Sequence, residues 1–327
     1  MKAGKKNGAV GVVGLGIMGG AYAKNLVAGG WRVIGFDTNP ARRREAARVG
    51  VRIVNDAKAV AREVPIIITS LPSPSALDMT VDGIIASGAP RRILIEAGTF
   101  ALEDKTRAAE RLAAAGHVAL DCPVSGTGAQ ARVRDLVVYA SGDPRTVAKL
   151  RPLFAAFSRA VYDLGAYGNG SRMKYVANLL VAIHNVASAE AMVLGMKAGL
   201  DPKTILALVA AGAGTSRVFE LRAPMMVENR YVDATMKVST WQKDMAVIGE
   251  YAAQAGCPTP LFSATLPIYA AAMSNGHGPH DTASVCAVLE DMAGVTRGAT
   301  RAASRKRAAS RRAASPRRKG RPRARPA

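Results

Sequence analysis

A glycine-rich segment close to the N-terminus has the spacing of a dinucleotide-binding turn. The apolar run Ala9–Val13 leads directly into G-x-G-x-x-G, and a helical pattern follows. In such a turn the first glycine permits a tight bend, the second lets a pyrophosphate approach the backbone, and the third lets helix and strand pack closely. Amides at the helix start then face the diphosphate. A plain glycine turn is the alternative, but the flanking pattern favours a cofactor site formed by Gly14, Leu15, Gly16, Ile17, Met18 and Gly19.

A carboxylate after the next apolar run bears on which cofactor binds. Asp37 follows Arg32–Phe36 and lies 18 residues after Gly19. A carboxylate there accepts hydrogen bonds from ribose hydroxyls and repels a 2′-phosphate, which favours NAD over NADP. Three arginines just downstream, from Arg42 to Arg44, either grip that phosphate or form the solvated start of a helix. The sequence therefore predicts NAD, with NADP as the alternative.

A lysine and an asparagine in the second half of the chain have the spacing of a proton-transfer pair. Lys174 and Asn178 lie four residues apart in a helical pattern, so both project from one face. Oxidising an alcohol by hydride transfer needs a base for the hydroxyl proton. An amine is such a base only if desolvation or nearby positive charge lowers its pKa from about 10.4 toward roughly 7–8. We expect both residues to be catalytic, against the alternative of a surface lysine and a solvated asparagine.

A loop with two hydroxyl side chains is a candidate anchor for a substrate carboxylate. Ser125, Gly126 and Thr127 follow a strand pattern that ends at Asp121, and ligands of open α/β sheets bind at such strand ends. Backbone amides and the two hydroxyls can hold a carboxylate there. An ordinary glycine-rich loop is the alternative.

The elements that position these residues fall into two regions. From Ala9 to about Asp163, strand-like runs alternate with helical ones, such as Leu102–Ala115, where Leu102, Ala109, Leu112 and Ala113 can share an apolar face. This alternation predicts a mostly parallel sheet with helices on both sides. The expected strands are Ala9–Val13, Arg32–Phe36, Val51–Val54, Ile66–Ser70, Arg92–Glu96, His117–Asp121, Leu136–Ala140 and Ala160–Asp163.

After Gly165 the strand patterns stop and helical patterns follow. Proline at the first helical position marks starts at Pro202, after Asp201, and at Pro260, after Thr259. We therefore expect a dinucleotide-binding domain over residues 1–166 and an all-helical domain for substrate and oligomerisation over 167–296. The expected helices are Ser171–Ala198, Pro202–Ala211, Pro224–Glu228, Trp241–Ala255, Pro260–Asn275 and Asp281–Ala293.

The net charge of +21 is concentrated at the C-terminus. Residues 297–327 hold 13 of the 45 Lys and Arg residues and no Asp or Glu, which leaves +8 on the rest of the chain. This segment repeats Arg-Ala-Ala-Ser and has almost no large apolar side chain to offset its ordering entropy, so we expect disorder. Weak binding of nucleic acid through the tail is a further expectation.

Composition limits where the protein can function. Apolar residues make up 49% of the 327 residues, enough for a full core in about two domains. The three cysteines (Cys122, Cys257 and Cys286) are too few and scattered for a disulfide framework or a zinc ribbon, so we expect reduced thiols and no metal site. Stretches 175–189 and 252–280 are too short or too interrupted to span a membrane. Six glycines in the uncharged run that follows Lys6 disfavour reading residues 1–23 as a signal peptide, and we expect a cytoplasmic protein.

Four motifs together resemble the β-hydroxyacid dehydrogenase family, which includes 3-hydroxyisobutyrate dehydrogenase and tartronate semialdehyde reductase. In chain order they are Gly14–Gly19, Asp121-Cys-Pro-Val-Ser-Gly126, Gly168-Asn-Gly170 with Lys174 and Asn178, and Lys243-Asp244. The resemblance covers roughly residues 9–292. It implies a Rossmann-type, doubly wound α/β domain followed by an all-α domain, an active site between them, and a homodimer or homotetramer.

The resemblance also assigns roles to individual residues. It implies that Ser125, Gly126 and Thr127 bind the substrate carboxylate, that Lys174 is the general acid/base, and that Asn178 is its partner. Further candidate cofactor contacts are Leu71, Pro72, Thr99 and Lys243, the last helping to close the site.

The sequence departs from the family pattern at three places. Thr127 replaces the usual second glycine, Ala177 replaces an asparagine, and Glu96-Ala-Gly-Thr99 replaces aspartate–serine–serine–threonine. These departures leave the reaction class intact but alter the substrate pocket. The form Ser125-Gly-Thr-Gly-Ala-Gln130 suggests a subgroup acting on sugar acids such as threonate.

The predicted function is NAD(P)-dependent, reversible oxidation of a small 3-hydroxy carboxylic acid. Candidate substrates are 3-hydroxyisobutyrate, a glycerate–tartronate semialdehyde pair, or a sugar acid. Two alternatives stay open. One is a nucleic-acid-associated protein whose dehydrogenase activity is incidental, and the other is an imine reductase on the same fold. Retention of Lys174 favours the dehydrogenase, because imine reductases usually place another residue there.

Overall fold

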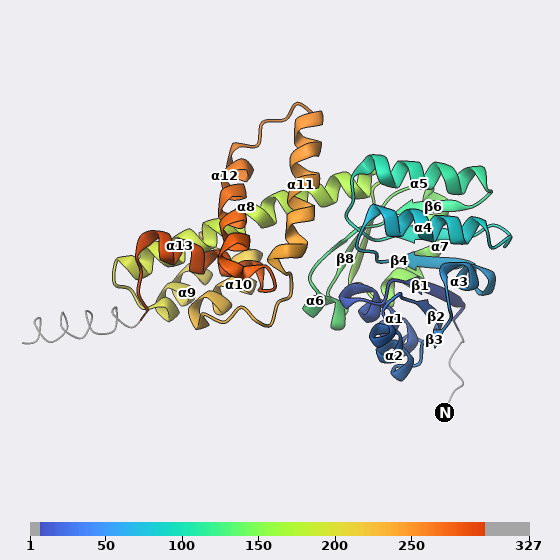
Figure 1. Cartoon of the computed structure of the whole chain (residues 1–327), viewed down its shortest axis with the longest axis horizontal. Helices are drawn as coiled ribbons and strands as arrows, with labels where there is room; N and C mark the ends of the chain where they lie inside the picture. Colours follow the sequence, from blue (N-terminus) through green and yellow to red (C-terminus); the bar gives the residue numbers. More distant parts are fainter. Residues whose placement is uncertain (1–6, 298–327) are drawn as a thin grey trace, which may run out of the picture. The chain divides into compact units, whose positions relative to one another are not determined.

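The computed structural model describes residues 7–297, and a parallel six-stranded sheet forms its first part. The strand order is β3-β2-β1-β4-β5-β6, so the order reverses between β1 and β4. Ligands of such sheets bind beyond the carboxyl ends of the strands at this reversal. The strands, which Figure 1 shows as arrows, are β1 Ala9–Val13, β2 Arg32–Phe36, β3 Arg52–Ile53, β4 Ile66–Thr69, β5 Ile93–Glu96 and β6 Val118–Asp121.

Helices cover both faces of this sheet because its strands alternate their apolar side chains between two cores. Ile68 and Ile95 face a core that includes residues of α1 and α7, whereas Ile67 and Leu94 face a core that includes residues of α3, α4 and α5. The expected doubly wound arrangement is thereby confirmed. The helices of this region are α1 Ile17–Ala28, α2 Pro40–Arg48, α3 Ala57–Glu63, α4 Pro74–Ile85, α5 Leu102–Ala114, α6 Gly128–Arg132 and α7 Pro144–Ala155.

Two of the expected strands belong to a second sheet. β8 (Val137–Ala140) pairs in parallel with β9 (Ala160–Asp163), and on its other side it pairs antiparallel with β7, Val124–Ser125, which the sequence analysis missed. Pro123 separates β6 from β7, and a proline cannot donate to a strand ladder. The chain therefore leaves the large sheet after Asp121, and an isolated bridge between Asp121 and Ser141 connects the two sheets.

The buried face of α5 differs from the expected one. Its fully buried residues are Lys105, Ala108 and Leu112, whereas Ala113 is exposed. The prediction failed because it placed only apolar residues inside. Lys105 lies in the core because carboxylates accompany it there, as described below.

After β9 the chain is helical, and several helix boundaries differ from expectation, most clearly those of α10 and of the helix at Pro260. The side chain of Ser216 accepts a hydrogen bond from the Phe219 amide, so α10 begins seven residues before Pro224, which lies inside the helix. The helix at Pro260 ends at Ala272 and continues as a π-helical turn, Met273–His277. The helices are α8 Asn169–Lys197, α9 Pro202–Ala210, α10 Arg217–Glu228, α11 Val238–Gln254, α12 Pro260–Ala272, a 3-10 turn Thr282–Ser284, and α13 Val285–Ala293.

Contacts divide the chain into two compact units that are not continuous in sequence. The described residues of the first unit are 7–182 and 235–263, and those of the second unit are 183–234 and 264–297. α11 belongs to the first unit together with the first part of α8. The Tyr175 and Tyr251 rings from these two helices pack 4.9 Å apart, which explains why α11 is not grouped with the other late helices.

α8 is the one helix within residues 7–297 that is long and apolar enough to cross a membrane. In its most apolar window 44% of the residues are buried inside the structure, and a single helix of this length and composition is weak evidence for a membrane span.

The expected disordered tail lies outside the described residues except for its first residue. Arg297 donates hydrogen bonds to the Val227 carbonyl at 3.0 Å and from its Nε to Glu290 at 3.0 Å. Arg297 is therefore part of the second unit rather than of the tail.

Candidate active site

The three motif glycines meet three different surroundings. Gly14 has a φ of +88°, and a Cβ there would lie 2.2 Å from the Ser70 carbonyl oxygen. A Cβ on Gly19 would lie 1.8 Å from the Gly14 carbonyl oxygen, so this glycine lets α1 pack against the turn. A Cβ on Gly16 would meet no atom within 4 Å. Only the second glycine therefore borders open space, where a pyrophosphate fits.

The start of α1 suits an anion. No side chain caps its first turn, and that turn contains no acidic residue. The amides of the first turn are therefore left for a ligand, and the helix dipole favours negative charge there. A dinucleotide diphosphate fits this cradle.

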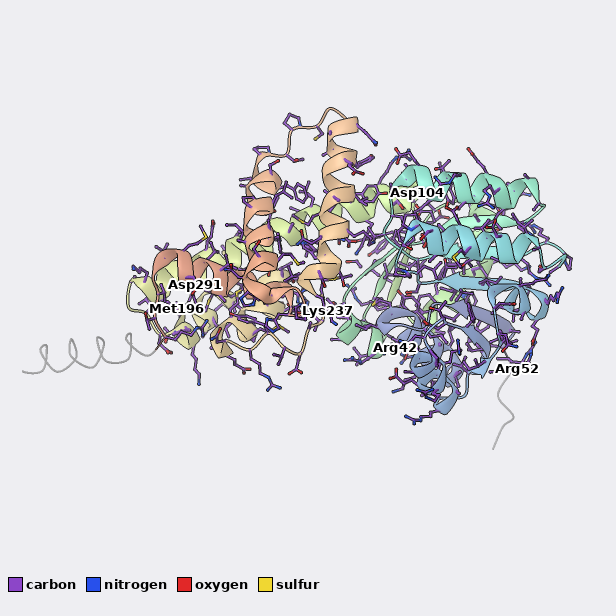
Figure 2. All side chains as sticks on the ribbon, in the orientation of Figure 1. Arg42, Arg52, Asp104, Met196, Lys237 and Asp291 are labelled. Atoms are coloured by element: carbon purple, nitrogen blue, oxygen red, sulfur yellow. The ribbon has the colours of Figure 1, made fainter. Side chains whose placement is uncertain are left out.

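Asp37 is held against the glycine turn. Its carboxylate accepts a hydrogen bond of 2.7 Å from the Leu15 amide and another of 2.7 Å from the Asn39 amide. Of the nearby arginines, Arg43 donates to the Asp37 carbonyl at 2.7 Å, and Arg42 projects from α2 and pairs with Glu45 at 3.0 Å (Figure 2). Two of the three arginines, Arg42 and Arg43, therefore already have partners within the protein.

Lys174 and Asn178 lie on α8 beside Asp244 and Lys243 on α11. The Asn178 amide donates to the Asp244 carboxylate at 3.0 Å, and the Lys243 ammonium pairs with the other Asp244 oxygen at 3.0 Å. Asn178 and Asp244 are buried, whereas Lys174 and Lys243 are partly exposed. The side-chain amine of Lys174 makes no hydrogen bond or ion pair with any residue in the described part of the chain. Its amine is thus free to meet a substrate.

The electrostatics of this cluster adjust the charge of Lys174. Burial disfavours the ammonium form, and Lys243 adds repulsion, while the Asp244 carboxylate opposes both effects. Together they lower the pKa of Lys174 from 10.5 to about 8. This value lies near the range that a general base needs at neutral pH. The sequence analysis gave no role to Asp244, whose position next to Lys243 was the only available signal.

The turn from Gly98 to Phe100, which joins β5 to α5, is connected to this cluster. The Lys243 ammonium donates to the Thr99 carbonyl and lies 4.9 Å from the centre of the Phe100 ring. The Tyr175 hydroxyl donates to the Phe100 carbonyl at 2.6 Å. Thr99 is therefore placed near Lys243, as two candidate cofactor contacts should be.

Leu71 and Pro72 follow β4 on the side of the glycine turn. A Cβ on Gly14 would lie 3.3 Å from a Leu71 methyl group, so this leucine packs against the turn. Pro72 is exposed.

The loop Ser125–Thr127 lies beside the glycine turn. A Cβ on Gly128 would lie 2.3 Å from an Ile17 methyl group, so the start of α6 packs against the start of α1. The Thr127 amide is not a free donor for a carboxylate, because it donates to the Gln130 side chain at 3.0 Å. The proposed carboxylate contacts of Thr127 are therefore limited to its hydroxyl. Within residues 7–297, no hydrogen bond joins the loop to Lys174 or Asn178.

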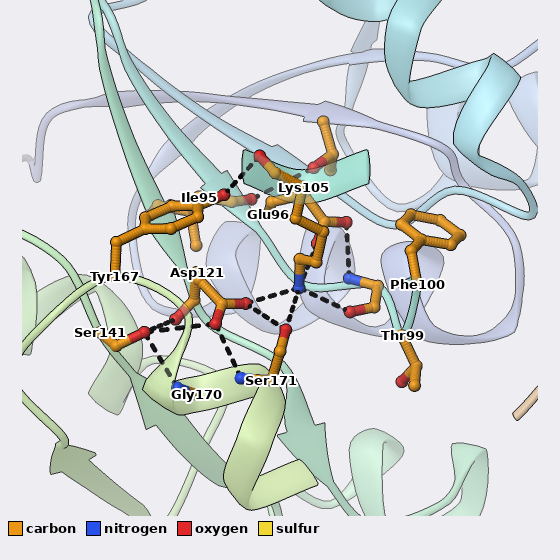
Figure 3. Close-up of polar contacts among 12 residues, drawn as sticks. Ile95, Glu96, Thr99, Phe100, Lys105, Asp121, Ser141, Tyr167, Gly170 and Ser171 are labelled. Carbon is orange, nitrogen blue, oxygen red and sulfur yellow. Dashed lines mark hydrogen bonds and ion pairs between the residues drawn. The ribbon is translucent and has the colours of Figure 1, made fainter. Parts of the chain in front are cut away.

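A buried ionic cluster that the sequence analysis missed lies beneath these elements. Lys105 is fully buried between Glu96 and Asp121, and Ser141 and Ser171 complete the cluster (Figure 3). A lysine on the core face of an amphipathic helix was the signal that could have revealed it. Residues 7–297 contain no group of three or more His, Cys, Asp or Glu that could hold a metal ion.

Comparison with known protein families divides the chain in two. Residues 9–165 match the family described as the NAD binding domain of 6-phosphogluconate dehydrogenase. Residues 168–289 match the family described as NAD-binding of NADP-dependent 3-hydroxyisobutyrate dehydrogenase.

Similar proteins cover most of the chain. An L-threonate dehydrogenase of Cupriavidus necator is 30% identical over 86% of this chain and 95% of its own length. The crystal structure of 3-hydroxyisobutyrate dehydrogenase from Salmonella typhimurium has a TM-score of 0.79 at 28% identity, covering 86% of this chain and all of that one. A Streptomyces aurantiacus imine reductase has a TM-score of 0.57 at 20% identity over 86% of this chain and 99% of that one, a likeness of fold alone.

Proposed function

The chain belongs to the β-hydroxyacid dehydrogenase family, and from this premise we propose that it reversibly oxidises a small 3-hydroxy carboxylic acid with Lys174 as the general base. The reaction class is that of an NAD(P)-dependent dehydrogenase acting on CH–OH groups. The observation that carries the assignment of Lys174 is its unpaired amine on α8, with a pKa near 8, beside Asn178, Lys243 and Asp244.

The residues of this chain divide the work of the reaction. The Lys174 amine accepts the proton as the substrate O–H bond breaks, and the carbonyl forms as the C–H bond gives up its hydride. The nicotinamide cofactor, when bound, supplies the hydride acceptor. Asn178, held by Asp244, orients the substrate hydroxyl. The Ser125 and Thr127 hydroxyls with the Gly126 backbone hold the carboxylate.

The site favours a polar substrate within this class. Thr127 adds a hydroxyl where the family usually has glycine, and the similar Cupriavidus necator protein is named for L-threonate. We therefore place sugar acids of the threonate type ahead of 3-hydroxyisobutyrate and glycerate. The imine reductase alternative gains no support, because that likeness is limited to the fold.

The arrangement at Asp37 supports NAD as the preferred cofactor. Its carboxylate is held at the glycine turn, and Arg42 and Arg43 are engaged elsewhere. We expect a higher kcat/KM with NAD than with NADP, and Asp37→Ala should narrow that difference by removing the repulsion of a 2′-phosphate. Steady-state kinetics with both cofactors measures this. A wild-type enzyme that prefers NADP would contradict it.

The activity and the role of Lys174 are tested together. Purified protein is screened spectrophotometrically with threonate, 3-hydroxyisobutyrate, glycerate and related acids, with NAD and with NADP. On the best substrate, Lys174→Ala should lower kcat by about 10²–10⁴-fold, as expected for loss of a positioned base. NAD affinity should stay nearly unchanged, because the diphosphate binds at the start of α1.

Two further variants and one control complete this test. Asn178→Ala should lower kcat/KM, whereas Ser125→Ala should act mainly through KM. Lys149→Ala, at an exposed lysine of α7, is the matched control and should leave turnover unchanged. Rescue of Lys174→Ala by small amines would support proton transfer, and near wild-type turnover of that variant would overturn the assignment.

We place the protein in the cytoplasm as a homodimer or homotetramer. Several large apolar side chains of the second unit are exposed, as an oligomeric interface requires: Leu194, Leu200, Leu208, Val232 and Met292. Light scattering on the protein as it elutes from a size-exclusion column measures the oligomeric state. Weak nucleic-acid binding through residues 298–327 is a separate property, carried by their cations.

A further inference from the structure

Lys105 is the only fully buried lysine in the part of the chain that the structure describes, and it is surrounded by acceptors. Its ammonium lies 2.6 Å from Glu96 and 2.5 Å from Asp121, and it donates to the Gly98 carbonyl at 3.0 Å and to the Ser171 hydroxyl at 3.0 Å (Figure 3). These partners come from the ends of β5 and β6, from the turn before α5, and from α8. One side chain therefore joins four segments.

The first connection runs to the turn that bears Thr99. Glu96 accepts the Gly98 amide hydrogen at 2.7 Å, and Lys105 donates to the Gly98 carbonyl, so both backbone polar groups of Gly98 are held. The next carbonyl, of Thr99, accepts from Lys243. Lys105 and Glu96 thus hold Gly98, and Lys243 holds the carbonyl of the next residue in the same turn.

The second connection runs to the helix that bears Lys174. Ser171 lies in the first turn of α8, three residues before Lys174. It donates its amide hydrogen to Asp121 at 2.7 Å and its hydroxyl hydrogen to Asp121 at 2.8 Å, and it accepts from Lys105. A carboxylate at a helix N-terminus also complements the helix dipole. Asp121 and Lys105 thus fix where α8 begins.

The charges of the cluster explain why a cation is needed there. Burial alone disfavours the Lys105 ammonium, but the Asp121 and Glu96 carboxylates more than compensate and raise its pKa. Without that cation, two carboxylates would be buried close together with one fewer donor each. Buried ion pairs contribute little net stability compared with apolar packing, whereas their geometry is specific. The cluster therefore serves mainly to position the segments that it joins, which are the ends of β5 and β6, the turn before α5, and the start of α8.

We propose that Lys105 is a positioning residue, which holds the turn Gly98–Phe100 and the first turn of α8 in the relative arrangement that hydride transfer requires. This proposal rests on the proposed function for its effect on turnover. Lys105 itself touches neither substrate nor cofactor. It acts through Thr99 on one side and through Lys174 on the other.

The test variant removes the cation together with one of the two negative charges that it neutralises, and it leaves Asp121 with its hydrogen bonds. Lys105→Met alone would strand two buried negative charges, so the variant is the double substitution Lys105→Met with Glu96→Gln. The glutamine can still accept from the Gly98 amide, and Asp121 keeps its bonds from Ser171 and Ser141. Lys149→Met, at an exposed lysine of α7, is the matched control.

Two measurements are made on each full-length variant. Amide hydrogen exchange is followed by mass spectrometry with NAD present and no substrate, and kcat and KM are measured on the best hydroxy acid. We expect exchange in residues 97–101 and 171–178 to become at least about tenfold faster, while the strands of the large sheet stay protected. We expect kcat to fall about 10²-fold, because a small misplacement of reacting groups slows the chemical step by about that factor. The KM values for NAD and for the hydroxy acid should change less. The control should match the wild type.

Other outcomes overturn the proposal. Unchanged exchange in both segments, or faster exchange spread evenly over the sheet with normal kcat per folded molecule, would make Lys105 an ordinary core residue. If the double variant does not fold, Ser171→Ala replaces it and should loosen 171–178 while sparing 97–101, and the reverse pattern contradicts the proposal. If the wild type oxidises no hydroxy acid, the proposed function fails, and hydrogen exchange still decides the role of Lys105.

Discussion

At the scale of single residues, the site depends on opposed effects acting on one amine. Burial and Lys243 disfavour the charged form of Lys174, and Asp244 favours it. A lysine suits this role because its pKa responds to burial, whereas a guanidinium stays charged in proteins. Asp244 also holds Asn178, so one carboxylate influences both the charge of the base and the orientation of its partner.

The pH dependence of the reaction follows from this balance. Lys174 accepts a proton only as the neutral amine, so kcat/KM for oxidation should rise with pH through about 8 and then level off. The reverse reduction needs the ammonium form of Lys174, so its kcat/KM should fall as the pH rises over the same range. Asp244→Asn removes the charge that raises the pKa of Lys174, so the oxidation limb should move to lower pH. Initial rates in both directions measure the profiles, with Asp82→Asn on α4 as the surface control. If the pH profile of Asp244→Asn matches that of the wild type, the Asp244 carboxylate does not influence the pKa of Lys174.

At the scale of elements, two glycines of the β1–α1 turn differ in the space that surrounds them. Gly19 is required by the protein, because a Cβ there would lie 1.8 Å from the Gly14 carbonyl oxygen. Gly16 is not required by packing among the described residues, because a Cβ there would meet no protein atom within 4 Å. We therefore propose that Gly19 serves folding and that Gly16 serves cofactor binding.

This difference predicts opposite results for two matched substitutions. Gly16→Ala should leave the thermal unfolding temperature unchanged and weaken NAD binding at least about tenfold, because its methyl group occupies the space for the pyrophosphate. Gly19→Ala should lower the unfolding temperature of the cofactor-free protein by several degrees, because α1 must move away from β1. Thermal unfolding and NADH fluorescence titration distinguish them. Equal destabilisation by both substitutions would contradict the assignment of open space at Gly16.

At the scale of the whole molecule, the charge and the chemistry occupy different parts of the chain. All the candidate site residues belong to the first unit, whereas 13 of the 21 net positive charges lie in residues 297–327. Arg297 marks the boundary, since it pairs with Glu290 through a side chain that is only one-quarter exposed. A truncation should therefore end after Arg297 and not before it.

Two truncations that differ by one residue test this boundary. Deleting residues 298–327 should leave turnover within about twofold and abolish the salt-sensitive retention of nucleic acid, because cations bind phosphate through counterion release. Deleting Arg297 as well should lower the free energy of unfolding by about 1–3 kcal/mol, since Glu290 loses its charged partner. Turnover, filter binding at two salt concentrations and urea unfolding measure these effects. A large loss of kcat in the truncated protein that ends at Arg297 would show that residues 298–327 contribute to the active site.

Much of the fold could be predicted because it depends on local patterns. The strands β1, β2 and β9 have their predicted bounds, and the glycine turn lies between β1 and α1 as expected. The helix start at Pro202 has Asp201 as its cap, with the carboxylate accepting from the Thr204 amide at 3.3 Å. Each of these features needs only neighbouring residues, so sequence spacing is sufficient to reveal it.

The sequence by itself determined the family, the glycine turn between β1 and α1, and the placement of Lys174 and Asn178 four residues apart on one helix, because each depends on short patterns along the chain. The tertiary structure alone decided that Asp244 accepts from Asn178, that Thr99 is linked to Lys243, and that Lys105 is buried with Glu96 and Asp121. These partners lie between 9 and 144 residues apart in the chain. A charged side chain can be buried only where distant carboxylates meet it, and that meeting depends on how the sheet and α8 pack.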